Sequence, residues 1–86
     1  MSNPITELLS LSKNENAVVA KSASKALSYA DELKKGTLSQ DEYSALLEQL
    51  ATSKEIAEEI DDKDLKDNLS VLINTLIKIG SAVAGM

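Results

Sequence analysis

The chain has 86 residues and a formal net charge of −5, and it contains no cysteine and no histidine. These absences exclude disulfide bonds and thiolate metal sites, and they remove the commonest general base and metal ligand. All nine basic residues are lysine, so no guanidinium group can clamp a phosphate or carboxylate with two hydrogen bonds. The length fits one domain, residues 1–86, with a core of leucine, isoleucine, valine and alanine.

The first half of the chain predicts two helices, near residues 4–11 and 15–35. An Asn-Pro pair opens the first helix, because asparagine is a good cap and proline suits the first helical position. We expect Ser12 or Asn14 to cap the second helix and Gly36 to end it. The apolar positions of the second helix recur at steps of four and three, which is a heptad pattern. They are Val19, Ala23, Ala26, Ala30 and Leu33.

A third helix is predicted near residues 39–60. Ser39 and Glu42 form a capping box, in which each side chain reaches the backbone N–H of the other residue. Thr52 and Glu55 match the same pattern and would allow a kink or a restart. We expect a continuous helix, because no glycine or proline interrupts the segment.

The last predicted helix, near residues 63–80, has the widest apolar face and begins at Asp61 or Asp62. Its apolar residues again follow steps of four and three, with isoleucines beside the seam. The seam and its flanks are Leu65, Leu69, Leu72, Ile73, Leu76, Ile77, Ile79 and Val83. Because no segment alternates like a strand, the predicted fold is all-α, with a short N-terminal helix and three longer ones.

Three interpretations of this wide apolar face remain open. It can be the central core helix of a monomeric bundle. It can instead be an oligomer interface, in which like helices pack around an axis, and we predict that oligomerisation completes the bundle. It can also insert into a membrane interface, although one lysine and no tryptophan near its end make a poor membrane anchor.

Motifs for chemistry are weak in this sequence. Ser22 with Lys25, and Ser10 with Lys13, fit the S-x-x-K pattern of serine acylases. That pattern acts only within a larger fold with further partners, so we interpret both pairs as solvated helix faces. No phosphate loop, calcium loop or dinucleotide fingerprint is present. The chain is therefore predicted not to be an enzyme, with no catalytic residue, no cofactor, no metal and no small-molecule substrate.

Charge is unevenly distributed along the chain. Residues 39–67 carry ten acidic residues and three lysines, whereas residues 1–38 carry four acidic residues and five lysines. A net-negative chain with an acidic middle is a poor nucleic-acid binder, because phosphate contacts need clustered cations. The acidic stretch is typical of a solvated helix face, and the alternative is a docking surface for a basic partner.

Residues 31–50 resemble the short C-terminal (SHOCT) motif, a helical hairpin joined by Lys-Gly and Ser-x-x-Glu-Tyr signals. The matching positions are Leu33, Gly36, Leu38, Ser39, Glu42, Tyr43, Leu46 and Leu47. The SHOCT motif usually closes a longer protein, whereas here a further helix follows it. Small proteins of tailed bacteriophages carry similar hairpins, and this resemblance implies an assembly or virion role without a catalytic residue.

The resulting hypothesis is a non-catalytic structural or assembly protein, a small subunit of a larger complex such as a tailed-phage virion. Its expected partners are copies of itself or other structural subunits, in the virion or the host-cell cytoplasm. With no basic, apolar N-terminal signal, secretion is not expected. The alternative is a small acidic binding or regulatory adaptor, and the third hypothesis is a membrane-active amphipathic protein.

Overall fold

The structure is a computed structural model that describes residues 3–85, which are helical throughout apart from short connections. The elements are α1 (Pro4–Leu11), α2 (Ala17–Lys35), α3 (Gln40–Ala51), α4 (Lys54–Glu59), α5 (Lys63–Ile79) and the 3₁₀ helix η1 (Gly80–Gly85). No strand occurs in this part of the chain. The all-α prediction of one short helix and three longer helical segments is confirmed, with the third segment divided into α3 and α4.

The α1–α2 connection corrects the predicted start of the second helix. Asn16, rather than Ser12 or Asn14, is the cap, and its side-chain oxygen accepts from the N–H groups of Val18 and Val19 at 2.9 and 3.2 Å. The Asn14 side chain instead accepts from the Asn16 N–H at 2.9 Å, which forms a turn before the helix. The helix therefore begins at residue 17 and not at residue 15.

The continuous helix predicted over residues 39–60 is wrong. The Ser53 backbone is extended, with φ −66° and ψ 146°, and its side chain caps α4 by accepting from the Ile56 N–H at 3.5 Å. An α-helix turns about 100° per residue, so a continuous helix would carry Ile56 about 180° away from Leu47. The break turns Ile56 and Ile60 inward instead, and each is 2% exposed.

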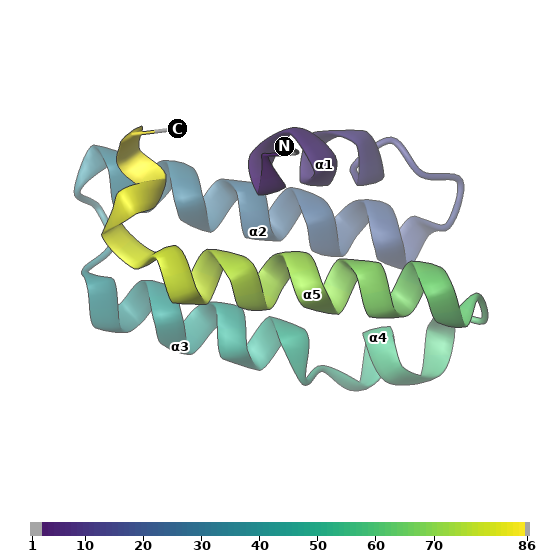
Figure 1. The fold of residues 1–86 in the computed structure, drawn as a ribbon. Coiled ribbons are helices and arrows are strands. Elements are labelled where there is room, and N and C mark those ends of the chain that lie inside the picture. Colours follow the sequence, from purple (N-terminus) through teal and green to yellow (C-terminus); the bar gives the residue numbers. More distant parts are fainter. Residues whose placement is uncertain (1–2, 86) are drawn as a thin grey trace.

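Three rows of helices form the bundle (Figure 1). Helices α2 and α5 run in the same direction, while α3 and α4 together run antiparallel to them. Helix α1 packs against α2 and α5. The 3₁₀ helix η1 packs against α2, α3 and α5, at the end of the bundle where α2 and α5 end and α3 begins (Figure 1). Helix α5 therefore has neighbours on several sides, which explains its wide apolar face.

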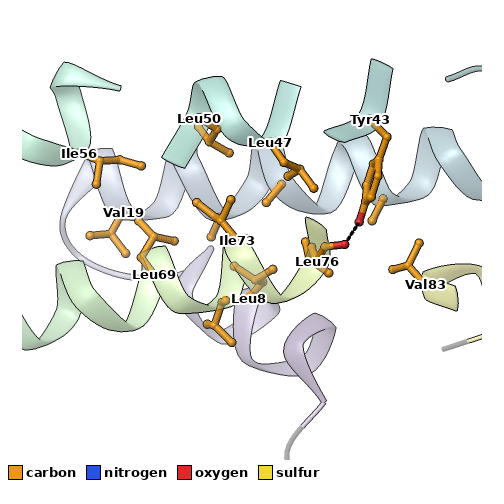
Figure 2. Close-up of a cluster of buried hydrophobic side chains, with 14 of the residues drawn as sticks. Leu8, Val19, Tyr43, Leu47, Leu50, Ile56, Leu69, Ile73, Leu76 and Val83 are labelled. Atoms are coloured by element: carbon orange, nitrogen blue, oxygen red, sulfur yellow. Dashed lines mark hydrogen bonds between the residues drawn. The ribbon is translucent and has the colours of Figure 1, made fainter. Parts of the chain in front are cut away.

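The buried apolar side chains of the described residues form one cluster between these helices (Figure 2). They are Leu8, Val19, Ala23, Ala26, Ala30, Tyr43, Leu47, Leu50, Ile56, Ile60, Leu69, Leu72, Ile73, Leu76 and Val83. The predicted alanine-rich face of α2 belongs to this cluster, and small side chains let neighbouring helices approach closely. One hydroxyl lies in the core, that of Tyr43, and it donates to the Leu76 carbonyl at 3.3 Å.

Candidate functional site

The predicted interface residues of the last helix lie mainly inside the chain's own core. Leu69, Leu72, Ile73, Leu76 and Val83 are buried. The other three, Leu65, Ile77 and Ile79, are partly buried and pack against the same cluster. Because the bundle already covers this seam, only these last three side chains can reach a second copy without the bundle opening. Self-association through the seam stays a prediction.

The exposed acidic residues of α3, α4 and the first half of α5 form what we call the acidic surface. Its members are Asp41, Glu42, Glu48, Glu55, Glu58, Glu59, Asp61, Asp62, Asp64 and Asp67, all of them exposed. Glu55 lies 3.9 Å from the Lys21 ammonium. Among residues 3–85, the other nine have no lysine nitrogen within 4.0 Å. Most of these carboxylates therefore have no direct lysine partner in the described chain, although Lys54, Lys63 and Lys66 belong to the same stretch.

The lysines around the acidic surface are engaged elsewhere or point outward. Lys66 on α5 donates to the Ala57 carbonyl of α4 at 2.9 Å, which ties the short helix to the bundle. On α2, Lys35 pairs with Asp31 at 2.9 Å, one helical turn away. The Asp31 hydrogen bond and charge raise the pKa of Lys35. Because the Lys35–Asp31 pair is exposed and screened by solvent, it orients side chains more than it stabilises the fold.

A small hollow of about 40 Å³ lies where α2 meets the break between α3 and α4. It is lined by Lys21, Ser22, Lys25, Leu50, Ser53 and Glu55. At roughly 10–15 Å³ for each water, it has room for about three waters, far less than the roughly 300 Å³ of a small-molecule pocket. The hollow can hold a small ion or waters.

The structure corrects the interpretation of one S-x-x-K pair. Ser10 and Lys13 are exposed, as predicted. Lys25 is also exposed, but Ser22 is only 5% exposed and lies against the hollow rather than on a solvated face. The sequence carries a signal for this, because Ser22 lies three residues after the buried Val19, on the core side of the helix.

The pKa shifts of Glu42 and Tyr43 come from contacts that support the fold. The Ser39 backbone N–H and hydroxyl hydrogen-bond to Glu42 and lower the pKa of its carboxyl group. Burial raises the pKa of Tyr43 to about 12.

No three acidic side chains among the described residues come together in a way that could hold a metal ion. In that same part of the chain, no helix combines the length and apolar character needed to span a membrane.

The hairpin on which the SHOCT resemblance rests has the geometry that its sequence predicts. Gly36 ends α2 in the left-handed conformation with φ 79°, and the Ser39 capping box then starts α3. No family model, curated protein or solved structure matches this chain. The resemblance therefore remains a prediction.

Proposed function

We propose that this chain is a non-catalytic structural or assembly subunit that contacts its neighbours through charged surface. The observation that carries the proposal is the acidic surface, in which nine carboxylates have no lysine partner within the described chain. The apolar seam of α5 is already covered by α1, α2 and α3. We therefore expect contacts with other subunits to use the outer faces, on which Leu9 and Val71 are the large apolar side chains exposed among the described residues.

The proposed contact is between the acidic surface and a lysine-bearing surface. A second copy supplies one through Lys21, Lys25 and Lys35, all exposed on α2. Such a contact joins two different faces of the same protein, and repetition of it closes into a ring or extends as a filament. Charge complementarity of this kind sets register and partner choice more than affinity. The larger complex that fits the hairpin resemblance is the virion of a tailed phage.

The test is light scattering of the purified chain over a range of protein and salt concentrations. An assembly held by opposite charges grows with protein concentration at low salt and dissociates above roughly 0.5 M salt, where the Debye length is only a few ångströms. Replacing Glu58 and Glu59 with lysine should abolish it. The matched control, Glu15→Lys with Glu32→Lys, makes the same change in net charge outside the acidic surface and should leave most of the assembly intact.

Two outcomes would reject contact between copies. A chain that stays monomeric at low salt and high concentration would instead favour the acidic adaptor, whose binding to a basic partner weakens with salt in the same way. Dye release from lipid vesicles would favour the membrane-active protein. That activity requires the bundle to open, because the apolar face of α5 is buried.

A further inference from the structure

The hollow between α2 and the α3–α4 break contains a polar group that the fold leaves unused. Ser22 is only 5% exposed, yet within residues 3–85 its hydroxyl has no hydrogen-bond partner. Serines in helices commonly bond the carbonyl four residues earlier, as Thr75 does here with Val71 at 2.7 Å. No fully buried polar side-chain atom among the described residues lacks a partner, so the Ser22 hydroxyl stays accessible from the hollow, where a water or a small ligand can bond it.

The other lining groups indicate which kind of occupant fits. Lys21 and Lys25, one helical turn apart, both line the hollow, and so does Ser53, which carries a second hydroxyl. All of these groups can donate hydrogen bonds, and the Glu55 carboxylate is the one group among them that can only accept. A set of donors with an excess of positive charge suits an anion rather than a cation.

The size of the hollow restricts the anion further. Room for about three waters corresponds to a small oxyanion and excludes a nucleotide or a peptide segment from the interior. We propose that this hollow is a binding site for a phosphate group, held by Lys21, Ser22 and Lys25. The proposal does not rest on the contact between copies, although Lys21 and Lys25 belong to the lysine-bearing surface of that contact as well.

Glu55 would act as a built-in competitor for the same site. Its carboxylate lies 3.9 Å from the Lys21 ammonium, and both side chains are more than half exposed. An exposed pair at that distance is weak, so an incoming phosphate can displace the carboxylate from Lys21. Because Glu55 belongs to the first turn of α4, phosphate binding would change a contact between α2 and α4.

The experiment is an NMR titration of the isotope-labelled chain with inorganic phosphate, with ionic strength held constant by sodium chloride. Saturable shifts at the amides of Ser22, Lys25 and Ser53 are expected. Ser22→Ala and Lys25→Met should each weaken binding about tenfold or more, the usual effect of losing a hydrogen bond to a charged group. Lys35→Met removes a cation from the same helix outside the hollow and should leave affinity unchanged.

Glu55→Gln is the sharpest variant, because it should tighten phosphate binding. The control Asp41→Asn removes the same charge at the start of α3 and should not. A parallel titration with phosphoserine distinguishes the source of the group. Binding of phosphate alone indicates a free ion, whereas binding of both indicates a phosphoryl group on a larger molecule. Shifts that fail to saturate, that spread over all lysines, or that persist in Lys25→Met would overturn the proposal.

Discussion

The hydroxyl of Tyr43 on α3 donates a hydrogen bond to the backbone carbonyl of Leu76 on α5, at 3.3 Å in the core. The same carbonyl accepts the N–H of Gly80, where α5 ends. One acceptor therefore joins α3 to the end of α5 and to the start of η1. The bond lets a large side chain place its polar end in an otherwise apolar core without leaving it unpaired.

Replacing Tyr43 with phenylalanine should cost about 1 kcal/mol of the free energy of unfolding, measured by urea denaturation at pH 7. The cost stays small because the Leu76 carbonyl keeps its bond from Gly80. A loss beyond about 3 kcal/mol would mean that the ring no longer packs in the same place.

The same variant tests the pH dependence. Burial raises the pKa of Tyr43 to about 12 in the folded chain, from its ordinary value of 10.0. The neutral hydroxyl contributes stability fully below the unfolded pKa, and that contribution is lost as pH rises through the folded pKa. Unfolding free energy should therefore fall more between pH 10 and 12 in the wild type than in Tyr43→Phe. Tyr29→Phe, which keeps Tyr43, should retain the wild-type decline.

Leu76→Ala should reduce the unfolding free energy by roughly 2–5 kcal/mol, because Leu76 is fully buried and its loss leaves a cavity. Val71, on the same helix, is 61% exposed, and Val71→Ala should change stability by no more than about 0.5 kcal/mol. The pair is compared by thermal and urea unfolding. Equal effects at the two sites would show that α5 does not pack on its own chain as described.

Gly80→Ala should destabilise the turn between α5 and η1. Its φ is 50°, a conformation that favours glycine, and an added Cβ would lie 2.8 Å from the Gln40 side-chain nitrogen. At Gly36, with φ 79°, nothing lies within 4 Å of an added Cβ, so Gly36→Ala should suffer backbone strain alone. If the contact with Gln40 causes part of the destabilisation, adding Gln40→Ala to Gly80→Ala should recover part of the lost stability. No recovery would assign the whole effect to the backbone.

The capping box at Ser39 should make α3 sensitive to acid. Ser39→Ala removes the bond that the hydroxyl accepts from the Glu42 N–H at 3.2 Å, and should cost about 1 kcal/mol. The pKa of Glu42 is lowered, so its contribution is present above the unfolded pKa and is lost as pH falls through the folded pKa. Glu42→Gln should therefore show a smaller decline in stability on acidification below about pH 4.5. An identical decline in the wild type and in Glu42→Gln would show that Glu42 does not cause the acid sensitivity.

Much of this fold follows from local signals in the sequence. The capping box at Ser39, the left-handed Gly36 and the cap at Asp62 are each decided by residues within one turn of the helix end. The core face of α2 follows from its heptad spacing. These features are predictable because short-range hydrogen bonds and one helix face determine them.

The break before α4 cannot be predicted from local signals, because it depends on which side chains face the core. No glycine or proline lies at the break, and the sequence on each side of it predicts a helix. The deciding signal is the phase of Ile56 and Ile60, which a continuous helix would expose. The hollow was equally hidden, since it is created by side chains of α2 meeting that break. Nothing in the sequence around Lys21, Ser22 and Lys25 indicates a hollow, because it forms only when the α3–α4 connection packs against them.

The proposed role in assembly is tested most directly by fractionating the native source by size and locating this chain by quantitative mass spectrometry. We expect the chain to sediment with a large particle, in a fixed ratio to the other subunits, and Glu58→Lys with Glu59→Lys to move it to the slow fractions. The control pair at Glu15 and Glu32 should stay with the particle. A chain found only in the slow fractions, as a free monomer, would contradict the account.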